Sequence, residues 1–239
     1  MNKNFNRLET LLCEKELSGA VSLGLSVCPN VPAKTGLSML DKHLNGGFPR
    51  GHLSEIIGPR SSGRSSIMCA ALAAATKRGE IVALVDAVDS FDPVSGQAAG
   101  IELSRMLWVR GQGASHCNAE RMIERAIKSA ELVCRAGQFG LVVVDVADAL
   151  PIQLRRVPSR AWMRLARAVE ASKTVGLLVG SVSMGRSSTG FSVVLTPTGQ
   201  FFRWSATDTQ RNLFKGLEFD VEVISTRQPI TVFRARTEC

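Results

Sequence analysis

The order of apolar runs and amphipathic segments between residues 53 and 179 constrains the fold more than any other feature of the sequence. Five short runs are apolar at nearly every position and rich in β-branched residues: 53–57, 81–85, 107–109, 141–144 and 175–179. Such runs are typical of parallel strands covered by helices on both faces. Segments with helical spacing lie between them, at about 64–77, 96–104, 118–136 and 159–172. This alternation predicts an α/β fold with a mostly parallel, twisted sheet flanked by helices.

The character of the chain changes after residue 190. Strand patterns now follow one another without long helices between them, at 192–195, 200–204, 217–224 and 230–236. Apolar and acidic residues alternate from Phe219 to Val223, which suits a strand with one face near solvent. The sequence therefore predicts an antiparallel extension at the C-terminal end of the core.

The N-terminal segment is predicted to be separate from the core. Residues 4–17 have helical spacing, and a stretch with Pro and Gly follows at 28–36. We expect residues 1–34 to be a helix and linker able to clasp a partner, and residues 35–239 to be the core domain. No run of eighteen apolar residues and no signal-peptide pattern occurs, so a cytoplasmic location is expected.

Charge and cysteine content limit the partners. The formal net charge is +8, which favours nucleic acid, although a surface that docks an acidic protein is the alternative. The six cysteines form no C-x-x-C pair and no Cys/His metal spacing. We expect Cys69 and Cys134 to be small core residues in a reducing compartment, and no metal site.

A glycine-containing segment between the first strand and the first long helix carries the chemistry. Its spacing is that of the phosphate-binding motif G-x-x-x-x-G-K-[ST], in which backbone N–H groups hold phosphates, Lys bridges the outer phosphates and the hydroxyl holds magnesium. Arg64 stands at the lysine position, and its planar fork does not replace a slim ammonium. Taken alone, the segment suits a phosphate site or a structural turn. Its residues are Gly58, Pro59, Arg60, Ser61, Ser62, Gly63, Arg64, Ser65 and Ser66.

The surrounding residues resemble the RecA family over about residues 35–236. The matching phrases are T-G-L-S-M-L-D, then G-G-F-P-R-G-H-L-S-E-I-I-G-P-R-S-S-G-R-S-S with Glu55 in the strand, then Val85-Asp86-Ala87, Asp92-Pro93 and the run 141–145. The resemblance implies a RecA-like P-loop fold, with ATP and magnesium as the ligands of its site. It also implies that Asp145 orients the magnesium ion.

The same resemblance shows where chemistry is missing. At the position of the family's general-base glutamate this chain has Val88, which cannot accept a proton from water. The adenine-stacking aromatic corresponds to Ser95, and the glutamine that senses the terminal phosphate corresponds to Ser181. The two lysines that reach a neighbouring subunit's nucleotide correspond to Ser225 and Arg227. Several such losses predict that hydrolysis is absent, and no catalytic residue is assigned.

Basic residues stand where the family has its two DNA-binding loops. On a helix beginning near Ser159, three arginines share one face, opposite a face with Trp162, Leu165 and Val169. A solvated helix surface, a DNA phosphate contact and a protein docking surface are the three interpretations. The residues concerned are Arg155, Arg156, Arg160, Arg164, Arg167 and, in the shortened second loop, Arg186.

Within the RecA family, the chain looks most like the ImuA-type proteins of bacterial SOS mutagenesis cassettes. The phrases are G-P-R-S-S-G-R-S-S, A-L-V-D-A-V-D-S-F-D-P, L-W-V-R-G, R-R-V-P-S-R-A-W and G-L-E-F-D-V-E-V. The resemblance implies an adaptor in translesion synthesis whose partners are an ImuB-like inactive polymerase, an error-prone C-family DNA polymerase and RecA. The alternatives are a divergent DNA-dependent ATPase using Asp86 or Asp89 as base, and a switch that binds ATP without cleaving it.

Overall fold

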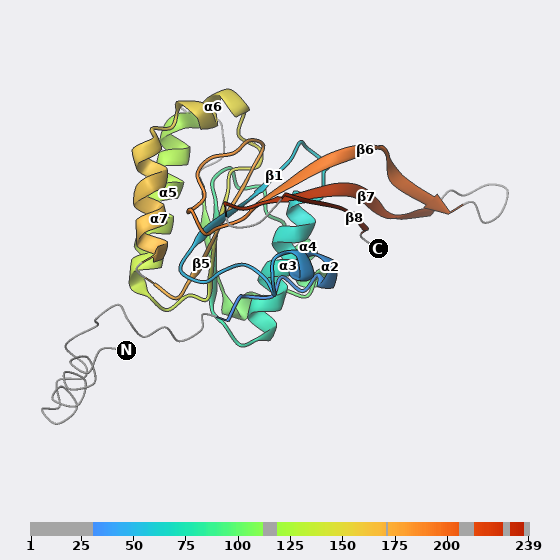
Figure 1. Cartoon of the computed structure of the whole chain (residues 1–239). Coiled ribbons are helices and arrows are strands. Elements are labelled where there is room, and N and C mark those ends of the chain that lie inside the picture. The colour runs from blue at the N-terminus through green and yellow to red at the C-terminus, as the bar shows by residue number, and fades with distance from the viewer. Residues whose placement is uncertain (1–30, 112–118, 171, 206–212, 227–229, 237–239) are drawn as a thin grey trace, which may run out of the picture. The chain divides into compact units, whose positions relative to one another are not determined.

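The computed structural model describes residues 31–111, 119–170, 172–205, 213–226 and 230–236, which form an α/β fold around one eight-stranded sheet (Figure 1). The strands are β1 (Leu53–Ile57), β2 (Val82–Asp86), β3 (Met106–Arg110), β4 (Leu141–Asp145), β5 (Val175–Gly180), β6 (Ser192–Ser205), β7 (Leu213–Ile224) and β8 (Thr231–Arg236). The helices are α2 (Ser38–His43), α3 (Arg64–Lys77), α4 (Pro93–Ala98), α5 (Ala119–Ala136), α6 (Pro151–Arg156) and α7 (Ser159–Glu170). The predicted fold class is confirmed, whereas the helix predicted at 4–17 lies outside the described residues.

The sheet has the strand order β3-β2-β4-β5-β1-β6-β7-β8. The pairs from β3 to β6 are all parallel, and the β6–β7 and β7–β8 pairs are antiparallel. The antiparallel part thus begins one strand later than predicted, because β6 pairs in parallel with β1 through Ser192–Val194 before it turns to β7. The strands predicted at 192–195 and 200–204 are one continuous strand, and with β7 it forms a ribbon that extends from the core (Figure 1).

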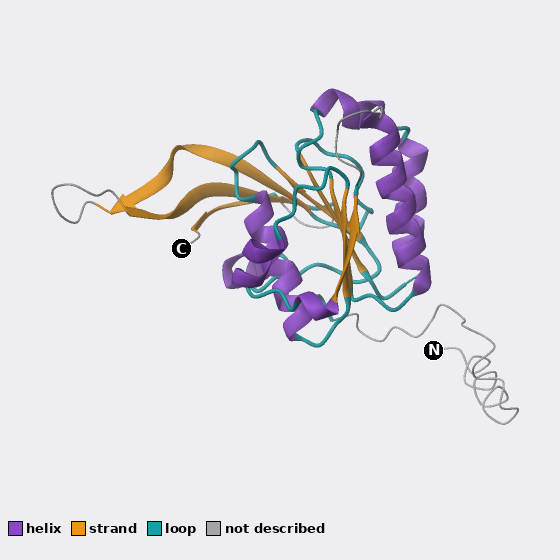
Figure 2. Ribbon diagram, turned by 180° about the vertical axis from the view of Figure 1, so that it is seen from behind, coloured by secondary structure: helices purple, strands orange, loops and turns teal. Residues whose placement is uncertain are grey.

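Helices cover the two faces of the sheet separately. Helices α2, α3 and α4 lie on one face, and α5, α6 and α7 lie on the other (Figure 2). Each face has its own buried apolar cluster, with Leu72 in the first and Ile127 in the second. Helix α7 buries Trp162, Leu165 and Val169, as its spacing predicts.

The helix predicted at 96–104 is wrong in its bounds. Asp92 caps α4 by accepting hydrogen bonds from the Val94 and Ser95 amides, and Pro93 is the first helical residue, so the helix starts earlier. Gly100, at φ +92°, lies just after the C-terminal end of α4. A separate 3₁₀ turn then covers Leu103–Arg105 before β3.

The two cysteines of the described helices behave as core residues, as expected. Cys69 is half-buried, Cys134 is buried, and both are free. Burial raises the pKa of Cys69 to about 11 and that of Cys134 to about 12, so neither is a thiolate at neutral pH. Among the described residues no group of three or more His, Cys, Asp and Glu could hold a metal ion, and no helix has the length and apolar content needed to cross a membrane.

Candidate nucleotide site

The glycine-containing loop joins the end of β1 to the start of α3. All five residues of β1 are buried, so the loop leaves the sheet from a fixed base. Gly63 caps α3 with φ +90°, and Ser61 has φ +58°. Because no side chain caps α3, its first N–H groups face the loop, the arrangement that binds phosphate in motifs of this spacing.

The interior of the loop contains an unpaired hydroxyl. The Ser62 side chain is buried, and its Oγ is one of two buried side-chain polar atoms in the described residues that lack a hydrogen-bond partner. Gly58 is required opposite it, since a Cβ there would lie 2.4 Å from the Ser62 Oγ. A buried orphan hydroxyl beside free helix N–H groups fits a phosphate oxygen as a ligand.

Arg64 turns into the protein instead of standing free for a ligand. It is only 6% exposed, and its Nη1 donates to the Ala147 carbonyl at 3.1 Å. Burial lowers the pKa of this guanidinium, while the carboxylates of Asp145 and Asp148 oppose that effect. Arg60 pairs with Asp148 at 2.9 Å. Both arginines of the loop are therefore held by the segment that follows β4.

Asp145 lies where the resemblance requires it, at the end of β4 beside Asp86 of β2. Its side chain is almost fully buried, and its Oδ1 accepts the Ala147 N–H at 2.9 Å. Burial, and less strongly the charges of Asp86 and Asp148, raise the pKa of Asp145 to about 6. A carboxylate desolvated in this way would gain from a cation, so the residue fits a magnesium-orienting role.

The raised pKa of Asp145 gives a testable pH dependence. In the folded protein Asp145 keeps its proton up to about pH 6, whereas in the unfolded chain it loses the proton near pH 4. The contribution of Asp145 therefore lowers the free energy of unfolding as the pH rises from about 4 to 6. Asp145→Asn should therefore gain stability over the wild type across that interval, by up to about 3 kcal/mol, and keep a constant advantage above it. Urea denaturation at half-unit pH steps measures this difference. A pH-independent difference between the two proteins would contradict it.

Val88 stands at the position predicted to lack the general base, and the two neighbouring acids both accept hydrogen bonds within the fold. Val88 is half-buried in the turn after β2. Asp89 makes two hydrogen bonds to Arg110, at 2.7 and 2.8 Å, which lower its pKa. Asp86 is fully buried and accepts the Ser90 and Phe91 amides. These hydrogen bonds hold both carboxylates in place, and those from Arg110 make Asp89 a weaker base, which argues against their use as substitute bases.

The other residues at family positions are also used within the fold. The Ser95 hydroxyl donates to Asp92 at 2.5 Å, so it completes the cap of α4. The Ser181 hydroxyl donates to the Ala149 carbonyl at 3.4 Å. Ser225 follows β7, and Arg227 lies outside the described residues.

A buried glutamate fixes the segment that replaces the second family loop. Glu55 is fully buried in β1, where its Oε1 accepts the hydroxyls of Ser183 and Ser192 at 2.8 and 2.6 Å. Its Oε2 accepts the amides of Met184 and Gly185 at 3.0 and 3.4 Å. Sequence reasoning noted Glu55 only as part of the family strand. The signal for its role is a lone charge in an otherwise buried strand, which requires partners.

The basic residues predicted as contacts divide between two places. Arg186 of the second segment donates to the Gly190 carbonyl at 3.3 Å. Arg155 and Arg156 lie on α6, and the other three lie on α7, on the sheet face opposite α3 (Figure 2). These five are exposed: Arg155, Arg156, Arg160, Arg164 and Arg167. The structure does not bring them to the glycine loop.

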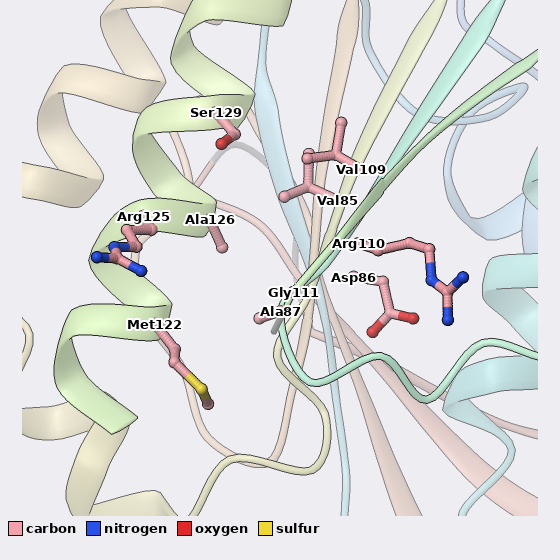
Figure 3. A pocket seen from close by; sticks show the side chains of 10 residues that line it. All are labelled: Val85, Asp86, Ala87, Val109, Arg110, Gly111, Met122, Arg125, Ala126 and Ser129. Atoms are coloured by element: carbon pink, nitrogen blue, oxygen red, sulfur yellow. The ribbon is translucent and has the colours of Figure 1, made fainter. Parts of the chain in front are cut away.

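A separate pocket of about 230 Å³ lies between the sheet and α5, at the ends of β2 and β3 (Figure 3). The side chains of Asp86 and Arg110 point away from α5, so these residues line the pocket mainly with backbone. Its lining residues are Val85, Asp86, Ala87, Val109, Arg110, Gly111, Met122, Arg125, Ala126 and Ser129. Nothing in the sequence predicted this pocket, because it depends on how far α5 stands from the edge of the sheet.

Strand order, the β1–loop–α3 turn and an acidic residue at the end of β4 define an α/β protein of the RecA-like superfamily. The chain belongs to the RecA family: the RecA N-terminal domain model matches residues 18–184, which is more than half of its length.

Individual relatives agree with this assignment. The chain is 32% identical to Protein RecA of Chlorobaculum parvum over 163 residues, which is 62% of this chain and 44% of that protein. It is 28% identical to Protein RecA of Symbiobacterium thermophilum over 216 residues, 84% of this chain and 59% of that protein. It is 31% identical to Protein RecA of Treponema pallidum over 176 residues, 67% and 40% of the two chains. The chain thus spans about half the length of the curated relatives it matches.

Proposed function

We propose that this protein is a RecA-fold adaptor related to DNA repair, which acts in SOS-induced error-prone translesion synthesis and does not hydrolyse ATP at a useful rate. The observation that carries the proposal is the replacement of the general base of hydrolysis by an aliphatic residue. Val88 stands there, and the two nearest acids are bound by Arg110 and by backbone amides. Phosphoryl transfer to water needs a group that positions the attacking water, and the Val88 side chain cannot do so.

The residues around the glycine loop still suit phosphate. The N–H groups of the α3 N-terminus and the Ser62 hydroxyl would hold its oxygens, and Asp145 would orient a magnesium ion, which when bound would neutralise phosphate charge. These features favour a second candidate function, a nucleotide-dependent switch. In it, ATP would stabilise one arrangement of the loop and of the segment after β4 without being cleaved.

The partners of the proposed adaptor are an ImuB-like inactive polymerase, an error-prone C-family DNA polymerase and RecA, with DNA contact as a further proposal. Support comes from the ImuA-type phrases of the sequence and from membership of the RecA family. The direct test is affinity purification of the tagged full chain from DNA-damaged cells. Recovery of a polymerase-family protein supports the adaptor; recovery of RecA filaments alone, with no polymerase, contradicts it.

Hydrolysis gives a sharper test of the same proposal. With single-stranded DNA present, we expect the wild-type chain to hydrolyse ATP at least about 100-fold more slowly than a RecA protein assayed beside it. The reason is that both the general base and the phosphate-sensing residue are replaced. Arg64→Ala, which removes the cation at the lysine position of the loop, should leave that background rate unchanged. A DNA-stimulated rate near that of RecA, lost in Arg64→Ala, would establish the divergent ATPase instead.

A further inference from the structure

Helices α5 and α7 pack side by side on one face of the sheet and present a shared outer surface (Figure 2). On α5 the buried residues include Ile123 and Ile127, so the helical period turns Arg121, Lys128 and Leu132 outward. On α7 the buried Trp162 and Leu165 likewise leave Arg160, Met163 and Arg167 outward. Arg164 points toward α5, where its Nε lies 3.5 Å from Glu131. We call the outward residues of these two helices the α5–α7 face.

The layer of helices α5, α6 and α7 carries most of the net positive charge of the chain. Helices α5, α6 and α7 together contain nine Arg and Lys residues and four Glu residues, against a net charge of +8 for the whole chain. A concentration of one sign on one layer produces a local positive potential that attracts an acidic partner.

The cations converge on a groove between the two helices. It has a volume of about 160 Å³ and is lined by Glu124, Lys128, Pro158, Arg160, Ala161 and Arg164. The exposed lining of the groove is mainly polar, and three of its six lining residues are cations, Lys128, Arg160 and Arg164. A groove lined in this way suits a carboxylate side chain.

Two large apolar side chains are exposed among these cations. Leu132 is 70% exposed and Met163 is 55% exposed. Met and Arg are enriched at protein interfaces, where an apolar centre is surrounded by charge. Leaving both side chains in water has no benefit for a surface that binds only phosphates.

Features of the α5–α7 face favour a protein over a nucleic acid. Glu124 stands on the wall of the groove, and Glu131 forms ion pairs with both Arg164 and Arg135. These pairs reduce the number of free cations, on which phosphate binding depends more strongly than protein docking does. The only aromatic residue of the two helices, Trp162, is buried, so no base can stack there.

We infer that the α5–α7 face docks an acidic amphipathic segment of a partner protein, whose carboxylates meet Lys128, Arg160 and Arg167 and whose apolar side chains cover Leu132 and Met163. Amphipathic helices that bind surfaces of this kind present their anchors at i, i+3, i+4 and i+7. The inference rests on the proposed adaptor function, for which it identifies the surface and the chemistry of the partner.

The test uses the full chain and a fluorescein-labelled 18-residue peptide with Glu and Asp on one helical face and Leu at i, i+4 on the other. Fluorescence anisotropy at physiological salt should give a Kd of about 10–100 μM, in the range of weak helix-in-groove contacts. Lys128→Glu/Arg160→Glu should weaken binding at least tenfold. The control Lys34→Glu/Lys42→Glu makes the same charge change at exposed lysines elsewhere on the chain and should leave the Kd unchanged.

The apolar contribution is tested separately. Leu132→Ser/Met163→Ser should raise the Kd of the peptide at least fivefold, whereas Val94→Ser, at an exposed valine of α4, should leave the Kd unchanged. A peptide with every Leu replaced by Ser should bind weakly to all these proteins. Equal binding of the two peptides would overturn the inference. A 20-base-pair duplex that binds through Lys128 and Arg160, unaffected by Leu132→Ser/Met163→Ser, would overturn it in favour of DNA.

Failure of the docking surface is distinguishable from failure of the adaptor function. If the Lys128→Glu/Arg160→Glu chain still recovers a polymerase-family partner from damaged cells, the adaptor stands and the α5–α7 face is not its contact. If the partner is lost with that variant and kept with Lys34→Glu/Lys42→Glu, the docking surface is supported in the cell.

Discussion

Replacing Glu55 by Ala is expected to lower the free energy of unfolding by about 3–5 kcal/mol, because four donors lose a charged acceptor inside the sheet. The two hydroxyls of Ser183 and Ser192 and the amides of Met184 and Gly185 all donate to this carboxylate. Glu55 itself is fully buried, so the lost hydrogen bonds lie inside the protein. The side chain also fills volume, so its removal leaves a cavity. Urea denaturation followed by circular dichroism measures the loss.

Two further variants make the Glu55 result specific. Glu55→Gln keeps the volume and one acceptor oxygen but adds an N–H₂ group that faces other donors, so a loss of about 1–3 kcal/mol is expected. Glu102→Ala removes an exposed carboxylate paired with Arg105 and should change stability by less than about 0.5 kcal/mol. If Glu55→Ala costs no more than Glu102→Ala, the Glu55 network does not hold the segment after β5.

The same variant should change local protection. Because Glu55 ties Ser183, Met184 and Gly185 to β1, its loss should expose residues 183–190 to a protease before the rest of the chain unfolds. Ser187 contributes a second attachment, since its N–H donates to the Leu53 carbonyl and its hydroxyl accepts the Leu53 amide. Cleavage at this segment in Glu55→Ala, but not in Glu102→Ala, would show that the glutamate acts there and not only on global stability.

The strands of the parallel sheet could be predicted from the sequence because burial on both faces leaves a continuous apolar run. The prediction for β1 at 53–57 has the observed bounds, and that for β5 at 175–179 misses only Gly180. The errors in the predicted helices arose where a capping residue or a proline sets the start of a helix. Asp92 and Pro93 start α4 three residues before the predicted 96, and the short α6 escaped prediction although Pro151 stands at its first position.

The candidate site could be predicted in its residues but not in its contacts. The positions of Arg64, Val88 and Asp145 can be predicted because the family motifs occur in a fixed order along the sequence. The bonds that engage them join distant segments: Arg64 reaches Ala147, and Asp89 reaches Arg110. Such pairings depend on which strands are neighbours and on side-chain length, and local periodicity does not specify either. The sequence alone therefore does not show that Arg110 pairs with Asp89.

Arg64→Ala is the second variant for which a large effect is expected, a loss of about 2–4 kcal/mol in the free energy of unfolding. The guanidinium is buried, donates to the Ala147 carbonyl and offsets the charge of Asp145. Without it, a buried carbonyl loses its donor, and the negative charges of Asp145 and Asp148 are less compensated. Arg60→Ala is the matched control. It lies in the same loop and pairs with Asp148, but its side chain is 81% exposed, so a change below about 0.5 kcal/mol is expected.

Arg64→Lys then separates the adaptor from the nucleotide switch. Lysine is a slim point charge, so it should leave empty the space beside Ala147 that the guanidinium fills. The free energy of unfolding of Arg64→Lys should lie between those of the wild type and of Arg64→Ala. If the guanidinium occupies the place of an outer phosphate, Mg-ATP should raise the melting temperature of Arg64→Lys by several degrees and leave that of the wild type unchanged. A wild-type protein stabilised by Mg-ATP as strongly as Arg64→Lys would mean that the buried arginine moves aside for the ligand. In that case the loop is a functioning phosphate site, and the nucleotide switch is the better description of the protein.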